Sequence, residues 1–214
     1  VGAALFSLPL GIGAAIFLTE YSANSPMTRA IRLAIVTLAG VPSIVFGLFG
    51  LGLFVQYLAF GPSILSGSLT LACMILPTII VASEEALKTV PLAMRDASLA
   101  LGATKWQAIR LNVLPYAMPG ILTGAILGIG RAAGETAPIL LTAVAFFMPR
   151  LPNSIFDQVM ALPYHLFILQ TQFPNASKVM PKSFGTALVL LFLVLGLNLL
   201  AIIIRARLRR RYKW

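Results

Sequence analysis

The sequence predicts an all-α protein, built as a polytopic bundle of membrane-spanning helices. Of its 214 residues, 59% are hydrophobic and only 10% are charged, and the mean hydropathy is +0.94. A soluble domain carries about 25% charged residues, because its surface faces water. The apolar residues also gather in long runs that short polar segments separate. We therefore expect one transmembrane domain over residues 1–214.

Five apolar runs approach or reach the length of about 20 residues that a helix needs to cross a bilayer. The first is short and contains Pro9, and no charge at all lies between Arg32 and Glu84. That uncharged length suits two spans, which a Gly-Pro-Ser turn at 61–63 divides. A later run continues past two charged residues. The predicted spans are residues 2–18, 33–58, 67–83, 116–148 and 184–204.

The basic residues predict the orientation of these spans. Six of them crowd the last ten residues, directly after an apolar run, and such clusters flank membrane helices on the cytoplasmic side. Counting back through the spans places the loop 19–32 and the polar segment 84–115 in the cytoplasm. Residues 149–183 then form an outer segment, and Val1 begins outside, which implies a sixth, preceding helix. The net charge of +10 therefore reflects topology rather than nucleic-acid binding.

The composition argues against an intrachain disulfide and against a zinc site of paired histidines. Cys73 is the only cysteine and His165 the only histidine. An intrachain disulfide needs two cysteines, and a zinc site of paired histidines needs two histidines. We expect no metal site and no cofactor bound by this chain.

The polar segment 84–115 predicts two short helices joined at a glycine. A helix over 92–101 follows Pro91, and Gly102 suits its C-terminal stop. Thr104 can cap the next helix, with Gln107 at the capping-box position. Pro115 is expected to end that second helix before the next span begins. Periodicity alone favours a helix pair that lies against the lipid headgroups.

Arg131 and Glu135 are charges inside the fourth predicted span. Four residues apart, they share one helix face and can pair. A charge within the membrane is costly, so it faces the bundle interior or a water-filled path. Two interpretations remain open, a structural ion pair and a substrate path.

Two further patterns predict packing. Gly120, Gly124 and Gly128 recur every four residues, a spacing that lets another helix approach closely, either within the chain or from a second subunit. In the outer segment, Leu162, Leu166 and Leu169 have helical spacing, which indicates a short surface helix or an ordered cap.

Several motifs resemble those of a known family of importers. Asp96-Ala97-Ser98, Gly102 and Leu114-Pro115 resemble the EAA motif of binding-protein-dependent ABC importer permeases, with Asp96, Ser98 and Asn112 as departures from its Glu, second Ala and Ile. The segments 40–47, 66–71, 85–87, 101–106 and 134–138 look like the PstA-type permease of the phosphate ABC importer. The sister PstC-type permease is similar around residues 85–135.

This resemblance implies a type I ABC importer permease fold (MetI-like) and a role in phosphate import across the plasma (inner) membrane of a prokaryote. It implies that segment 84–115 sits in a cleft of the ATP-binding subunit, and that a second segment lines the translocation path. The implied coupling residues are Arg95, Asp96, Ala97, Ser98, Gly102, Ala103, Thr104 and Lys105. The implied path residues are Arg131, Glu135 and Thr136.

The resemblance also implies the partners. They are a PstC-like second permease, a dimer of PstB-like ATP-binding subunits that carries ATP and Mg²⁺, an extracytoplasmic PstS-like phosphate-binding protein, and membrane lipid. The chain contains no G-x-x-x-x-G-K-[ST] phosphate loop, so ATP hydrolysis is assigned to another polypeptide.

Three alternatives stay open at this point. The chain could belong to a permease for another oxyanion, because fold does not fix substrate. It could be an ion-coupled secondary anion transporter that uses the Arg131–Glu135 pair. A membrane enzyme is the third, against which the lack of a clustered His, Cys or acidic site argues.

Overall fold

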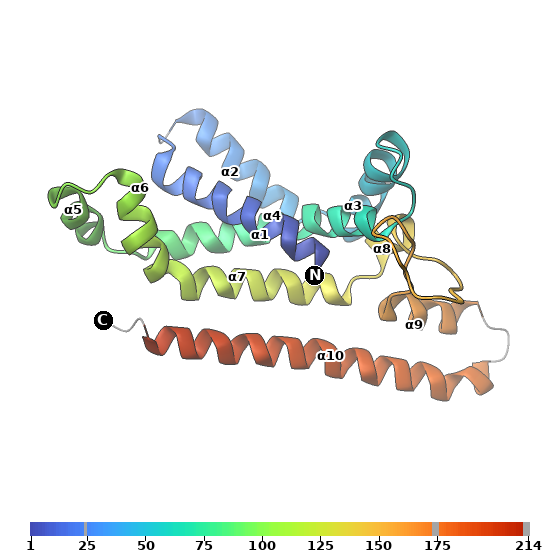
Figure 1. Cartoon of the computed structure of the whole chain (residues 1–214). Helices are drawn as coiled ribbons and strands as arrows, with labels where there is room; N and C mark the ends of the chain where they lie inside the picture. Colours follow the sequence, from blue (N-terminus) through green and yellow to red (C-terminus); the bar gives the residue numbers. More distant parts are fainter. Residues whose placement is uncertain (24, 173–175, 212–214) are drawn as a thin grey trace.

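The computed structural model describes residues 1–23, 25–172 and 176–211, and these form an elongated bundle of helices (Figure 1). Within the described residues, extended pairing is limited to one bridge between Val144 and Val159. Three segments, labelled η, are π-helical turns. The elements are α1 (Gly2–Ile16), η1 (Phe17–Tyr21), α2 (Pro26–Ala39), α3 (Ser43–Gly50), η2 (Leu51–Tyr57), α4 (Ile64–Lys88), α5 (Leu92–Ala100), α6 (Lys105–Ala108), η3 (Ile109–Val113), α7 (Leu114–Gly134), α8 (Ala137–Thr142), α9 (Leu162–Thr171) and α10 (Ala176–Arg211).

Among the described residues, four helices are long and apolar enough to cross a membrane, and a bent pair brings the number to at most five. The four are Gly2–Tyr21, Ile64–Lys88, Lys105–Gly134 and Val179–Ile203. The predicted all-helical membrane bundle is therefore confirmed.

The segment predicted as one span over 33–58 is not one straight helix. Its residues belong to α2 and to α3 with η2, two helices that meet at a bend of 103° and count together as at most one broken span. Pro42 causes this break, because proline lacks a backbone N–H and disfavours helical backbone in the residue before it. The predicted loop 19–32 is also too long. Ser25 caps α2 by accepting a hydrogen bond from Thr28 N at 3.2 Å, so the helix already begins at Pro26.

The fourth span differs from the prediction at both ends. One helix runs from Lys105 to Gly134 instead of beginning near residue 116. Pro115 does not end the elbow's second helix, because the wide turn of η3 lies directly before it, where proline cannot donate the regular hydrogen bond. At the other end Glu135 has extended backbone (φ −75°, ψ 135°), and α8 begins separately. Residues 135–148 are therefore not part of the span.

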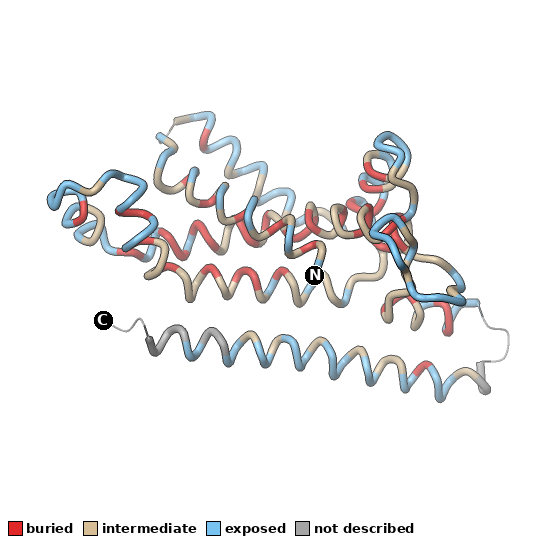
Figure 2. The backbone as a smooth tube through the Cα atoms, in the orientation of Figure 1, coloured by how far each residue is buried: buried red, intermediate tan, exposed pale blue. Residues whose placement is uncertain are grey.

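Helix α4 lies at the centre and packs against α1, α2, α3, α7 and α8. Figure 2 shows that buried residues gather on α4 and on the facing sides of α1 and α7. Gly120 lies against Ala86, where an added Cβ would come within 2.5 Å of the alanine Cβ, and Gly124 and Gly128 lie against Ala82 and Ile79. The glycine spacing thus serves packing within the chain.

Helix α10 lies along α7 and contacts α9, and it is largely exposed (Figures 1 and 2). The segments predicted for the cytoplasm lie at one end of the bundle, here called the elbow end, and the segment predicted outside lies at the other, here called the outer end. The elbow end holds the turn after η1, helices α5 and α6, and the C-terminal end of α10. The outer end holds α8, α9 and the loop between them, and α9 confirms the helix predicted in the outer segment.

Candidate functional site

The predicted elbow forms at one end of the bundle, and its local chemistry explains its shape. Helix α5 ends at Ala100, and Gly102 follows with φ +83°, a left-handed conformation that glycine adopts without strain. Thr104 then caps α6: its Oγ1 accepts from Gln107 N at 3.3 Å, and Thr104 N donates to Gln107 Oε1 at 2.8 Å. The predicted glycine stop and capping box are both confirmed.

The elbow presents an apolar face to the outside. Leu101 is 89% exposed and Leu92 73%, and the exposed side chains of Leu99 and Trp106 lie on the same two helices. Of the predicted coupling residues, Asp96, Ala97, Gly102, Thr104 and Lys105 are exposed and Ala103 is half-buried. Large exposed apolar side chains with charged neighbours are typical of a surface that another protein covers.

Arg95, another of the predicted coupling residues, is turned inward, and its side chain is only 15% exposed. Its Nη2 lies 2.7 Å from Glu20 Oε1, and Nε lies 3.1 Å from the same oxygen. Nη1 donates to Val90 O at 2.6 Å, and Nη2 also donates to Leu87 O at 2.9 Å. The guanidinium turns inward because it is the partner of a nearly buried carboxylate and of two carbonyls at the end of α4.

Ser98 is also turned inward, where it pairs with another departure from the EAA motif. Asn112 Nδ2 donates to Ser98 Oγ at 2.5 Å, and Ser98 Oγ donates to Met94 O at 2.8 Å. Ser98 is 5% exposed. The serine and the asparagine thus satisfy each other between α5 and η3, and the asparagine does not disturb the packing of the helix that follows.

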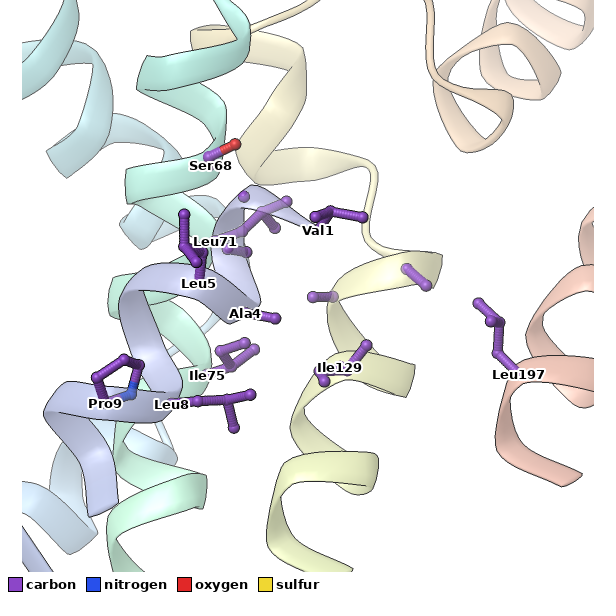
Figure 3. A pocket seen from close by; sticks show the side chains of 14 residues that line it. Val1, Ala4, Leu5, Leu8, Pro9, Ser68, Leu71, Ile75, Ile129 and Leu197 are labelled. Atoms are coloured by element: carbon purple, nitrogen blue, oxygen red, sulfur yellow. The ribbon is translucent and has the colours of Figure 1, made fainter. Parts of the chain in front are cut away.

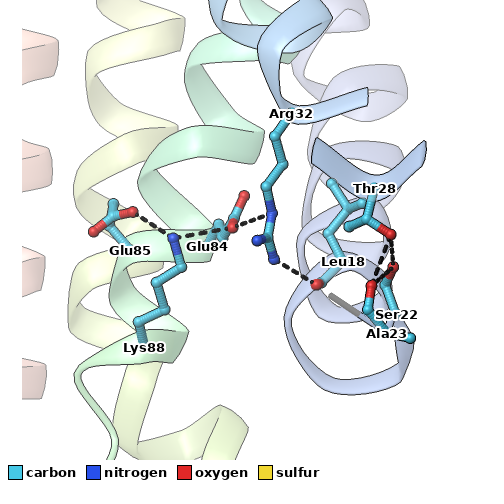
Figure 4. Close-up of polar contacts among 8 residues, drawn as sticks. All are labelled: Leu18, Ser22, Ala23, Thr28, Arg32, Glu84, Glu85 and Lys88. Carbon is cyan, nitrogen blue, oxygen red and sulfur yellow. Dashed lines mark hydrogen bonds and ion pairs between the residues drawn. The ribbon is translucent and has the colours of Figure 1, made fainter. Parts of the chain in front are cut away.

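A second ion-pair group lies beside the elbow, and sequence reasoning missed it (Figure 4). Glu84 is 6% exposed and lies 2.8 Å from Arg32 Nε and 3.0 Å from Lys88 Nζ. Arg32 Nη2 also donates to Leu18 O at 2.8 Å, which joins α2 to η1. The sequence held one signal for this pair, since Arg32 and Glu84 are the charges at the two ends of the uncharged run. A run that crosses the membrane twice has both ends on the same side, so these two charges could be expected to lie near each other.

Arg131 and Glu135 do pair, but at the end of a helix rather than deep within one. Arg131 Nε lies 3.4 Å from Glu135 Oε1, and the side chains are 39% and 18% exposed. Arg131 occupies the last turn of α7, where the helix dipole also favours a cation. Thr136 follows at the N-cap of α8. The structure thus brings the three predicted path residues together at the outer end.

Three of the segments that carry the resemblance, 40–47, 66–71 and 134–138, meet at this outer end. Gly47 of α3 lies against α8, where an added Cβ would come 3.0 Å from Pro138 Cα. Gly67 of α4 faces Ala143 in the same way. Ser63 N donates to Thr142 O at 2.9 Å, and Thr142 Oγ1 donates to Pro138 O at 2.8 Å. Small residues and short polar links therefore fix the segment that follows Glu135.

A cavity of about 640 Å³ opens among α1, α4, α7 and α10 (Figure 3). Its walls are almost wholly apolar, with Leu5, Leu8, Leu71, Ile75 and Ile129 among the lining residues. An anion in such a cavity would lose its hydration without gaining partners. A second cavity of about 180 Å³ reaches Glu135 and Ser68. In the described residues, no group of three or more His, Cys, Asp or Glu side chains is placed to hold a metal ion.

Comparison with known proteins decides the family. Residues 7–214 match the model of the family described as binding-protein-dependent transport system inner membrane component. The chain belongs to this family. As an inner membrane component with several apolar helices, it is a multi-pass membrane protein and a transport subunit. The predicted family resemblance is confirmed.

Individual relatives refine this placement. The chain is 38% identical to phosphate transport system permease protein PstA 1 of Mycobacterium tuberculosis, over 98% of the chain and 67% of the relative. It is 37% identical to the probable ABC transporter permease YqgI of Bacillus subtilis, over 92% of the chain and 70% of the relative. The solved methionine ABC transporter MetNI in inward-facing conformations has the same fold, with a TM-score of 0.77 at 19% identity, over 96% of this chain and 89% of that one.

The buried carboxylate of Glu84 allows a matched test of the ion-pair group. We expect Glu84→Gln to lower the stability of the purified protein by about 1–3 kcal/mol, because two cations lose the charged partner that joins α2 to α4. Glu85 is the control: its side chain is 66% exposed and pairs with Lys88, so Glu85→Gln should change stability by less than about 1 kcal/mol. Thermal unfolding in detergent measures both, and equal midpoints for the two variants would contradict the expectation.

Proposed function

We propose that the chain is the PstA-type permease subunit of an ATP-driven inorganic phosphate importer. The observation that carries the proposal is the 38% identity to PstA 1 over 98% of the chain. Permeases named PstC are also similar, at 36% identity over 66% of this chain. We propose that a PstC-like permease forms the other half of the translocation path and that an extracytoplasmic phosphate-binding protein delivers phosphate. Membership in a binding-protein-dependent family favours this function over an ion-coupled secondary transporter.

The exposed face of the elbow supports coupling to a separate ATP-binding subunit. The apolar side chains of Leu92, Leu99, Leu101 and Trp106 form an unpaired surface, with Asp96 exposed beside them. In our proposal a groove of a PstB-like subunit, which binds ATP and Mg²⁺, receives this surface. Closure of two such subunits then moves the elbow, and the span that follows it converts that movement into alternating access.

The face of α7 that carries Arg131 supports a path at the boundary between two permeases. Leu127, four residues earlier on that face, is 61% exposed, whereas the opposite face packs against α4. An arginine directed at lipid is costly. In the assembled importer this face therefore lies against the partner permease or a hydrated path, where Arg131 lowers the barrier for an anion and Glu135 limits how tightly the anion binds.

Reconstitution tests the proposed function directly. The full-length permease, with its partner permease, the ATP-binding subunits and the binding protein, should take up radiolabelled phosphate into proteoliposomes only when ATP and the binding protein are both present. Sulfate and molybdate serve as competing oxyanions. Uptake that followed a proton or sodium gradient without ATP would reject the importer.

Arg131→Gln should reduce phosphate uptake by about tenfold, which corresponds to about 1.4 kcal/mol of lost barrier lowering. Arg150 lies in the exposed outer loop and provides the control variant Arg150→Gln, which should transport normally. Uptake is compared at equal amounts of assembled complex. Wild-type uptake by Arg131→Gln would remove Arg131 from the path.

Leu101→Asp should reduce the amount of ATP-binding subunit that purifies with the permease by about tenfold, because it places an unpaired carboxylate at the centre of an apolar contact. Leu151, 87% exposed in the outer loop, is as exposed as Leu101 and lies at the opposite end of the bundle. Leu151→Asp should therefore leave the complex intact. Equal recovery of the ATP-binding subunit with both variants would argue against docking at the elbow.

A further inference from the structure

The end of the first described span holds both helices of the elbow through two adjacent residues. Glu20, in the π-helical turn η1, accepts from Arg95 of α5 at 2.7 Å. Tyr21, the next residue, lies under Lys105 of α6, whose Nζ is 4.9 Å from the ring centroid. These contacts join residues that are more than 70 positions apart in the sequence.

The Glu20–Arg95 ion pair is largely buried, and every nitrogen of the Arg95 guanidinium donates a hydrogen bond. The exposed fractions of the side chains are 7% for Glu20 and 15% for Arg95. Arg95 also donates to Val90 O and Leu87 O, so one guanidinium joins η1, the end of α4 and α5. If this guanidinium moved away, the nearly buried carboxylate of Glu20 would lose its charged partner and Val90 O would lose its hydrogen bond, which is strongly unfavourable. The three segments are therefore held as one unit.

Helix α5 packs against α6 and η3, which lead into α7. Its Met94 also packs against the apolar cluster that includes Leu18 of η1 and Leu87 of α4. The link to η1 therefore combines the charge of Arg95, the packing of Met94 and the Lys105–Tyr21 contact, whereas the link to α7 is made by packing and by the Ser98–Asn112 hydrogen bond. A displacement of α5 reaches α1 and α4 through Arg95 and Met94.

We propose that Glu20 and Tyr21 form a seat through which movement of the elbow is transmitted to α1 and α4, so that Glu20 and Arg95 are positioning residues for transport. This inference rests on the proposed function. Transport requires that movement below changes the arrangement of several spans together, and the second helix of the elbow continues into α7. The seat supplies the second route, to the two helices whose contact forms much of the core.

The experiment measures phosphate moved per ATP hydrolysed by the complete complex of full-length subunits in proteoliposomes. Glu20→Gln keeps the shape of the side chain but removes its charge. We expect assembly and ATP hydrolysis to remain, while phosphate moved per ATP falls about fivefold or more, the size of a typical coupling between sites. Arg29→Gln, which also removes a charge but at an exposed residue in the first turns of α2 and outside segment 84–115, should leave the ratio unchanged.

Tyr21 gives a second test that does not depend on a buried group, since it is 46% exposed. Tyr21→Phe keeps the ring under Lys105 and should transport normally, whereas Tyr21→Ala removes it and should lower phosphate per ATP about twofold, as expected for an exposed cation–π contact. If Glu20→Gln fails to assemble, the comparison of Tyr21→Ala with Tyr21→Phe decides the proposal.

The outcomes separate the seat from the proposed function. A wild-type complex that takes up no phosphate would reject the proposed function. A transporting wild type whose Glu20→Gln and Tyr21→Ala variants keep the full ratio of phosphate to ATP would reject the seat alone. A parallel loss of ATP hydrolysis and uptake in Glu20→Gln, with Tyr21→Ala fully coupled, would assign Glu20 to structure and also overturn the proposal.

Discussion

Two nearly buried carboxylates, Glu20 and Glu84, determine how the helices are joined at the elbow end. Each is held by a cation from another element: Arg95 of α5 for Glu20, and Arg32 of α2 for Glu84. In a lipid surrounding, apolar burial does not draw helices together as it does in water, so polar contacts and close packing determine their arrangement. Removal of either carboxylate would take away the charged partner of an arginine that joins two elements at this end.

Farther along the bundle, small residues take over from charges. Gly120, Gly124 and Gly128 bring α7 against α4, and Gly47 and Gly67 bring α3 and α4 against the segment around α8. These contacts need no charged group, which suits the region between the two ends. Helix α10 lies outside this close packing and remains largely exposed, so lipid or another subunit has to cover its apolar side chains.

Local chemistry could be predicted from the sequence where few residues determine it. The stop at Gly102 and the Thr104–Gln107 capping box depend on neighbours within four positions, and both form as predicted. Longer-range features could not be predicted in this way. The bend at Pro42 could not be predicted from the apolar composition of residues 33–58. The π-helical turn before Pro115 allows the helix to continue where this proline was expected to end it. The inward turn of Arg95 depends on Glu20, whose place in space only the folded chain determines.

One helix connects the two regions on which the proposed function rests. Lys105 and Gly134 are the ends of a continuous helix of 30 residues, about 45 Å long at 1.5 Å per residue. The capping box of Thr104 begins this helix at the elbow, and Arg131 lies in its last turn. A rigid rod of this length turns a small tilt at one end into a larger displacement at the other. Glu135 and Thr136 then follow in a segment that α3 and α4 hold in place. A tilt of the helix would therefore shift Arg131 relative to Thr136, and it would change the anion environment at the outer end without any change in the core around α4.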